Sequence, residues 1–295
     1  MFATVNTVKL FFDVIGSGVD MSDTLLKTKP VIIALNGGYG YDHTYLRLGL
    51  DALSKDYQIV YVDMRGHGKS EAVKRSTIQF ETMADDVAKL VEALGLESAI
   101  IFGHASGSFV AQKMAIRHPD KVKGLILVSS TMGMSVIPGK AEEGYPQFFL
   151  KDRVQGELLD VGHNFFFQPT ALTDQDFQYY CHNIGPYYFA TQNMGLCEKV
   201  ISYVTYNIDL VNHYRRLMPF YNSQGQVSNI KQPTLLMAGM YDWATPPVGS
   251  YMLANKLPDC DYVEFDQSGH YPFIEEPEKF QDSVWSFIDK NSFAV

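Results

Sequence analysis

Cysteine is scarce in this sequence, and its distribution argues against two classes of site. The 295 residues include three cysteines, Cys181, Cys197 and Cys260. An odd number at these spacings suits neither a disulfide framework nor a metal site, so we expect free thiols in a reducing compartment. Walker and dinucleotide-binding fingerprints are also missing. We therefore expect a protein that works without a metal and without an organic cofactor.

Positive charge and long apolar runs are equally scarce. The 24 lysines and arginines are outnumbered by 33 acidic residues, which gives a net charge of −9. This balance makes nucleic acid a poor partner and favours a small-molecule substrate. No apolar run approaches the roughly 18 residues of a membrane span, and the stretch from Met1 to Asp20 has one lysine and no long apolar run. We expect a cytoplasmic protein that does not bind membranes; the sequence does not indicate its oligomeric state.

Short β-branched runs do occur, and they alternate with helical patterns. This alternation predicts an α/β fold with a mostly parallel, eight-stranded sheet flanked by helices. Residues 80–94 repeat apolar side chains at helical spacing, as do residues 280–288. The expected strands lie at residues 31–35, 57–63, 99–102, 125–128, 234–238 and 262–265, with antiparallel edge strands within 5–14.

The alternation stops after Ser130 and resumes at about residue 231. The intervening residues 131–230 are rich in phenylalanine and tyrosine and have weak strand signals. We interpret this segment as an inserted helical cap, or lid. Residues 1–130 and 231–295 would then form the core.

A turn motif lies between the expected strand at 99–102 and the helix that follows it. A G-x-S-x-G nucleophile elbow places a serine on a strained strand-to-helix turn, and its glycines allow the backbone to turn sharply. Here Gly103 and Gly107 occupy the glycine positions, but the central residue is Ala105. A frame centred on Ser106 would flank it with His104 and Ser108, which are not the small residues that the turn needs. The alanine therefore stands in the nucleophile's position.

Three segments resemble α/β-hydrolases. The stretch GHASGSFVAQKMAIRHPDKVKGLILVSS is similar to their elbow, helix and next strand, and YVDMRGHGKS (Tyr61 to Ser70) to their D-x-R-G-x-G-x-S turn. NGGYGYDHTYLR resembles the H-G-G-P-G segment of proline-iminopeptidase-like members, with Asn36 for histidine and Tyr39 for proline. The resemblance covers the core and implies a serine hydrolase fold with a Ser…Asp…His order of catalytic residues.

The resemblance also implies the other catalytic residues. His270, in EFDQSGHYPFIEEP, matches the family's base, and Asp242, in PTLLMAGMYDWATPP, matches the acid that orients it. Asp266 is nearer to His270 in sequence, but we interpret it as a turn or capping residue. The other histidines, His104 among them, are expected to be structural or at the surface.

Backbone amides are expected to form the oxyanion hole. One is the N–H of Ser106, and the second belongs to Gly38 or, as the weaker candidate, Gly37. These donors do not depend on the side chain at position 105. Asn36, Tyr39, Tyr187 and Trp243 are candidate substrate contacts.

Ala105 admits two interpretations. We favour a serine hydrolase of a small ester, lactone or amide in which Ala105 is an engineered replacement of the nucleophile. Within this class the resemblance favours aminopeptidase or amidase chemistry. Such an enzyme needs a cap carboxylate for the substrate amine; Glu142, Glu143 and Glu157 are candidates, although solvated surface charge is the better interpretation of them. Alternatively, Ala105 is natural, and the protein is a cofactor-free dioxygenase, a lyase or a ligand-binding receptor on the same scaffold.

Overall fold

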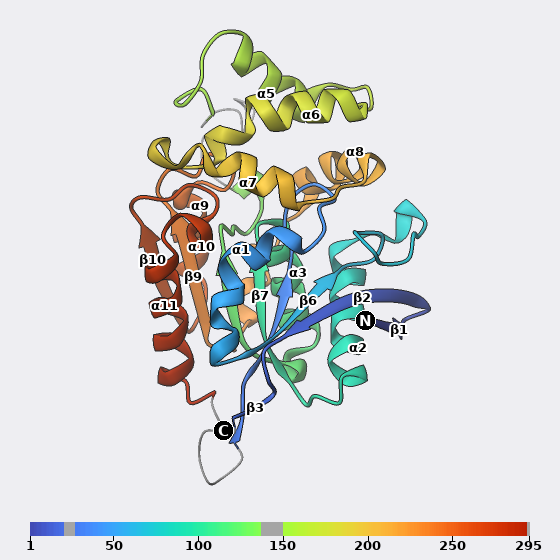
Figure 1. Ribbon diagram of the computed structural model, residues 1–295, viewed down its shortest axis with the longest axis vertical. Coiled ribbons are helices and arrows are strands. Elements are labelled where there is room, and N and C mark those ends of the chain that lie inside the picture. Colours follow the sequence, from blue (N-terminus) through green and yellow to red (C-terminus); the bar gives the residue numbers. More distant parts are fainter. Residues whose placement is uncertain (21–26, 137–149, 294–295) are drawn as a thin grey trace.

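A mixed sheet forms the centre of the molecule (Figure 1). The computed structural model describes residues 1–20, 27–136 and 150–293. Eight strands pair in the order β1-β2-β6-β5-β7-β8-β9-β10. The pairs β1–β2 and β2–β6 are antiparallel, and all the others are parallel. The predicted α/β fold with a mostly parallel eight-stranded sheet is therefore confirmed.

The strands lie close to their predicted positions. The central ones are continuous apolar runs, as expected for strands that are covered on both faces. A separate two-stranded hairpin, β3–β4, was not predicted. The bounds are β1 Phe2–Val5, β2 Val8–Ile15, β3 Val19–Asp20, β4 Lys27–Thr28, β5 Val31–Leu35, β6 Gln58–Asp63, β7 Ala99–His104, β8 Val122–Val128, β9 Thr234–Gly239 and β10 Cys260–Phe265.

Helices cover both faces of the sheet, because alternate side chains of each strand point to opposite sides. Ile33 and Leu35 of β5 pack in one buried cluster with side chains of α2, α3 and α9. Ile32 and Ala34 pack in a second cluster with side chains of α1, α10 and α11. The bounds are α1 Arg47–Leu50, α2 Phe80–Ala93, α3 Ser106–Arg117, α9 Pro247–Ala254, α10 Pro272–Glu275 and α11 Pro277–Lys290.

Between β8 and β9, the described residues form four further α-helices, which make a layer at one end of the sheet (Figure 1). Side chains of α5, α6 and α8 share a third buried cluster, which includes Phe165, Phe177 and Val211, whereas Cys197 and Val200 of α7 belong to the second cluster. We propose that these four helices form the cap of the 131–230 segment, and we refer to α5–α8 as the cap helices. Their bounds are α5 Glu157–Phe167, α6 Asp174–Asn183, α7 Leu196–Tyr203 and α8 Ile208–Leu217.

The helices of the described residues give no candidate for a membrane span, since none combines the length and the apolar character that a span requires. The cysteines Cys181, Cys197 and Cys260 are free thiols.

Candidate active site

A strained turn joins the central strand β7 to helix α3. Ala105 lies between them with φ of 48° and ψ of −118°, a conformation that costs a residue with a side chain about 1–3 kcal/mol. The residues two positions before and after Ala105 must be glycine because other backbone atoms approach them closely. A Cβ on Gly107 would lie 2.4 Å from the carbonyl oxygen of Leu35, and one on Gly103 would lie 2.6 Å from the Cα of Ser108. The local structure is therefore that of a nucleophile elbow, with alanine at its tip.

A buried histidine–aspartate pair comes from the loops after β9 and β10. The Nδ1 of His270 lies 2.7 Å from the Oδ2 of Asp242. The other carboxylate oxygen accepts the N–H groups of Ala244, at 2.9 Å, and Thr245, at 3.0 Å, while the Thr245 hydroxyl donates to Oδ2 at 2.7 Å. A carboxylate fixed in this way accepts the Nδ1 proton of His270. The Nε2 atom, which has no partner among the described residues, is then free to accept a proton.

A cavity of about 150 Å³ lies between the elbow and the cap helices. Ala105, Ser106, Gly38 and His270 line it from the core side. The cap side is mainly aromatic and includes Phe166, Phe177, Tyr180 and Tyr188. Reactive atoms of a ligand in this cavity would therefore lie next to the elbow and the histidine, while the rest of the ligand would contact aromatic rings.

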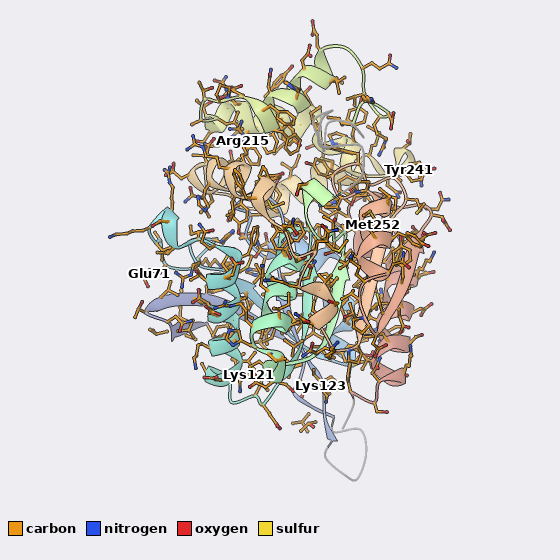
Figure 2. All side chains as sticks on the ribbon, turned by 180° about the vertical axis from the view of Figure 1, so that it is seen from behind. Glu71, Lys121, Lys123, Arg215, Tyr241 and Met252 are labelled. Atoms are coloured by element: carbon orange, nitrogen blue, oxygen red, sulfur yellow. The ribbon has the colours of Figure 1, made fainter. Side chains whose placement is uncertain are left out.

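Among the described residues that line the cavity, Arg215 is a charged side chain from the cap. Its hydrogen-bond donors are already engaged by other groups of the protein. Its guanidinium donates to the carbonyl oxygens of Phe165, Thr170 and Gln168 and to the side chain of Asn212. Figure 2 shows its place among the cap helices. Because these acceptors use its donors, Arg215 holds the end of α5 and is a poor partner for an anionic ligand.

Two backbone amides next to Ala105 are available to a ligand. Ser106 is the first residue of α3, so its N–H has no acceptor within the helix. Its hydroxyl donates to the carbonyl oxygen of Gly38 at 3.0 Å and thereby ties the elbow to the loop after β5. The Gly38 N–H has no acceptor among the described residues, whereas the Gly37 N–H donates to the Tyr45 hydroxyl at 2.7 Å. The N–H groups of Ser106 and Gly38 are therefore a pair of available donors, whereas the Gly37 N–H is engaged by Tyr45.

His104, which the sequence predicts to be structural or at the surface, connects the loop after β5 to the loop that carries His270. Its Nε2 lies 2.8 Å from the carbonyl oxygen of His270, and its Nδ1 lies 2.7 Å from the Tyr45 hydroxyl. A carbonyl can only accept, so Nε2 carries the proton and Nδ1 accepts from Tyr45, which in turn accepts from Gly37. Burial lowers the pKa of His104 well below its ordinary value and keeps the ring neutral. Its position next to Ala105 was the only signal in the sequence.

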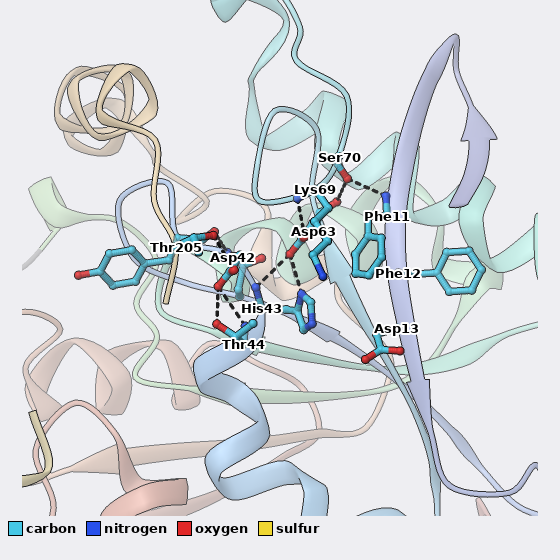
Figure 3. Close-up of polar contacts among 12 residues, drawn as sticks. Phe11, Phe12, Asp13, Asp42, His43, Thr44, Asp63, Lys69, Ser70 and Thr205 are labelled. Carbon is cyan, nitrogen blue, oxygen red and sulfur yellow. Dashed lines mark hydrogen bonds and ion pairs between the residues drawn. The ribbon is translucent and has the colours of Figure 1, made fainter. Parts of the chain in front are cut away.

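Side chains of the D-x-R-G-x-G-x-S turn fix the loop that carries Gly38 (Figure 3). Asp63 accepts the backbone N–H and the ring Nδ1 of His43, at 3.0 and 2.7 Å, and the N–H of Lys69 at 2.9 Å. Asp42, next to His43, accepts the hydroxyl of Thr205 at 2.7 Å, so the same loop is also bonded to the segment after α7. Asn36 donates to the carbonyl oxygen of Tyr41 at 2.6 Å and spans the turn.

The remaining candidate contacts lie in different places. Tyr39 lines the cavity. Asn36, Tyr187 and Trp243 are not among the described residues that line it. Trp243 is buried with its ring centroid 4.7 Å from that of Tyr188, and Tyr187 offers its carbonyl oxygen to Arg153.

The candidate cap carboxylates do not reach the cavity where they are described. Glu157 is the first residue of α5, and its side chain is exposed. Glu142 and Glu143 lie outside the described residues. Over the described ranges 1–20, 27–136 and 150–293, no cluster of three or more histidine, cysteine or acidic side chains could hold a metal ion.

Comparisons with known proteins agree with the fold. A family model described as the alpha/beta hydrolase fold matches residues 30–182 and 198–277. A proline iminopeptidase of Heyndrickxia coagulans is 26% identical over 294 residues, which cover 95% of this chain and 98% of that protein. The crystal structure of an enol-lactonase from Burkholderia xenovorans LB400 superposes with a TM-score of 0.75 at 22% identity, covering 98% of this chain and all of the other. An esterase from Exiguobacterium antarcticum gives 0.74 at 19% identity and covers 98% of each chain.

Proposed function

The chain belongs to the α/β-hydrolase fold family, and we propose from this premise that it carries a serine-hydrolase site with Ala105 in place of the nucleophile. The strained backbone of Ala105 carries the proposal. A positive φ at a residue with a side chain persists where the surrounding structure imposes it, and in this fold the turn serves to present a nucleophile. Alanine keeps the strain but has no atom that can attack a substrate.

The mechanism follows for the Ala105→Ser variant. The serine hydroxyl would attack the substrate carbonyl while the Nε2 of His270 takes its proton, and Asp242 would stabilise the resulting imidazolium. The N–H groups of Ser106 and Gly38 would stabilise the oxyanion. His270 would then protonate the leaving group, and a water molecule activated by the same histidine would release the acid from the acyl-enzyme.

The chain with Ala105 is expected to bind this substrate without forming an acyl-enzyme. Loss of a triad nucleophile lowers kcat by about 10⁶, yet roughly 10³–10⁴ of acceleration over water can remain through binding and the oxyanion hole. Main-chain donors, the His270–Asp242 pair and the cavity are all independent of the missing hydroxyl.

Within this class we propose an ester or lactone as the substrate in preference to a free-amine peptide. A free N-terminal amine needs a carboxylate at its end of the cavity. No carboxylate lines the cavity in the described part of the chain, and the aromatic walls favour uncharged groups. The aminopeptidase chemistry that the sequence resemblance favoured therefore has no support from these lining residues.

A second candidate is proton-abstraction chemistry by the His270–Asp242 pair alone, as in a cofactor-free dioxygenase or a lyase. One observation favours it: His270 and Asp242 are hydrogen-bonded to each other, and His270 lines the cavity although position 105 offers no nucleophile. In that case alanine is the natural residue at position 105, and the Ala105→Ser substitution would not create hydrolase activity.

Hydrolysis by matched variants tests the proposal. Purified Ala105 protein, the Ala105→Ser variant and the Ala105→Ser/His270→Ala variant are assayed with p-nitrophenyl butanoate, δ-valerolactone and proline p-nitroanilide. We expect ester or lactone turnover in the Ala105→Ser variant, and at least about 10³-fold less in the other two. A folded Ala105→Ser variant that turns over none of the three would contradict the proposal, and turnover of the proline amide alone would contradict the preferred substrate class.

A further inference from the structure

Two cap tyrosines meet inside the cavity. Tyr180 belongs to α6, and Tyr188 ends the short 3₁₀ helix Gly185–Tyr188. Their hydroxyl oxygens are 2.7 Å apart, and both residues line the cavity. The catalytic roles proposed above use neither hydroxyl.

The pair has one proton more than it needs for its own hydrogen bond. Two hydroxyls carry two protons, and one of these is donated to the other oxygen. Neither hydroxyl has another hydrogen-bond partner among the described residues. Burial raises the pKa of both phenols well above the ordinary value, so both stay protonated. One O–H donor therefore remains available to a ligand.

The donor is held in a fixed place. The ring of Tyr180 stacks on Phe165, with centroids 3.9 Å apart and planes at 18°. The ring of Tyr188 lies 4.7 Å from that of Trp243 and 5.4 Å from that of His270. Rings packed in this way lose little further freedom when a ligand binds, which favours affinity. The contact with His270 also places the pair next to the proposed reaction centre.

The rest of the cavity restricts the charge of the ligand. The donors of Arg215 are engaged by carbonyl oxygens, and no acidic side chain is among the described lining residues. An ionised group at the aromatic walls of this cavity would lose its water without gaining a free side chain of opposite charge among the described lining residues, which is costly. The ligand that fits is uncharged and largely apolar.

We propose that the Tyr180–Tyr188 pair is a specificity subsite that donates a hydrogen bond to a second, uncharged oxygen of the ligand. The oxygen is a carbonyl or ether oxygen, separate from the carbonyl that reacts. The orientation of the ligand, with its reactive carbonyl at Ser106 and Gly38, rests on the proposed function. The binding preference does not, because it needs no nucleophile.

Calorimetric titration of the Ala105 protein tests this proposal without turnover. Ethyl hexanoate is compared with ethyl 3-, 4- and 5-oxohexanoate, which place a second carbonyl at increasing distances from the ester. We expect at least one oxo ester to bind roughly 3- to 10-fold more tightly than ethyl hexanoate, the range of one net hydrogen bond.

The variant must remove both hydroxyls, because removing one would leave the other free to donate directly. The Tyr180→Phe/Tyr188→Phe variant removes two mutual partners and leaves no unpaired group. Its circular dichroism spectrum and urea-unfolding midpoint, compared with those of the Ala105 protein, serve as the folding control. The matched control is Tyr179→Phe/Tyr206→Phe, which removes two hydroxyls from cap tyrosines that are not among the described lining residues.

The oxo-ester preference should vanish in the first variant and persist in the second. The proposal is overturned if no oxo ester binds more tightly than ethyl hexanoate, or if the preference survives in the Tyr180→Phe/Tyr188→Phe variant. An oxo-ester preference together with an inert Ala105→Ser variant would retain the subsite and reject the hydrolase. Ester turnover by the Ala105→Ser variant without an oxo-ester preference would retain the hydrolase and reject the subsite.

Discussion

Among single residues, Asp242 is held in place by hydrogen bonds to both of its carboxylate oxygens. Its carboxylate accepts hydrogen bonds from two backbone amides, from Thr245 and from His270, and its side chain is fully buried. These contacts leave the carboxylate one arrangement, in which Oδ2 faces the Nδ1 of His270. The tautomer of the proposed base therefore depends on this residue.

Replacing the carboxylate by an amide should reverse the tautomer. In the Ala105→Ser background, Asp242→Asn is expected to lower kcat on an ester by about 10⁴, because an amide N–H facing Nδ1 would move the imidazole proton to Nε2. Steady-state kinetics measure the effect. Asp266→Asn is the control, since Asp266 is an exposed residue after β10 and should change kcat less than twofold by the general tolerance of surface sites. Equal losses in both variants would refute the assignment.

Sequence patterns place the residues at the elbow and after β9 and β10 because each follows a strand end within a recognisable motif. They do not place the residues that connect these segments. His104 is bonded to Tyr45 and to the carbonyl of His270, and that last partner lies 166 positions along the chain. Such a contact has no local signature, so the histidine could not be distinguished from an ordinary core residue.

At the level of elements, the turn between β7 and α3 holds Ala105 in a strained backbone conformation, although its methyl side chain has no chemical role there. The φ of Ala105 is imposed by the close approach of Gly103 and Gly107 to neighbouring backbone. Glycine adopts positive φ freely and would relieve the strain.

Ala105→Gly is therefore expected to stabilise the protein by about 1 kcal/mol. Relief of roughly 1–3 kcal/mol of strain is partly offset by about 0.5–1 kcal/mol of extra entropy in the unfolded chain. Urea unfolding gives the free energy of unfolding for comparison. In the middle of α3, Ala111→Gly has no strain to relieve and should destabilise by about 1 kcal/mol. Similar destabilisation by both variants would show that the turn is not strained.

The core elements were predictable, whereas the cap elements were not. The strand β5 at Val31–Leu35 has the predicted bounds, and α2 ends one residue before the predicted helix. Its apolar side chains face the sheet at a regular period. In the cap, aromatic side chains pack across helices, as Phe165 of α5 does on Tyr180 of α6, and Arg215 of α8 holds carbonyls of α5 and its end. Periodicity carries no information about such distant partners, so the sequence predicted helices there without their bounds.

For the whole molecule, two buried histidines make stability depend on pH. His67 belongs to the loop after β6 and packs on Tyr214, and His104 lies beneath the cavity. Burial lowers the pKa of both histidines below the ordinary value of 6.5. In the unfolded chain both return to about 6.5. As the pH falls below that value, the unfolded state takes up protons that the folded state refuses, so stability falls.

Urea unfolding between pH 8 and pH 5 should therefore show a loss that begins near pH 6.5, with a slope of up to about 1.4 kcal/mol per pH unit for each of the two histidines. His67→Gln should reduce this slope while leaving the proposed site intact. His163→Gln, at an exposed position of α5, should leave it unchanged. A slope that is the same in all three proteins would mean that other groups cause the loss.

The architecture brings together four segments that are separated in sequence: the loop after β5, the elbow after β7, the loop after β9 and the loop after β10. All lie at the carboxyl ends of parallel strands, which is where ligands bind in sheets of this kind. We propose that this junction is arranged for nucleophilic catalysis and is inactive only because position 105 is alanine.

Labelling with a fluorophosphonate probe tests this proposal. The Ala105 protein, the Ala105→Ser variant and the Ala105→Ser/His270→Ala variant are treated with the probe, and the modified residue is identified by mass spectrometry. We expect stoichiometric modification at position 105 in the Ala105→Ser variant and none in the other two proteins. A folded Ala105→Ser variant that stays unmodified would contradict the proposal and would favour proton-abstraction chemistry by His270 and Asp242 alone.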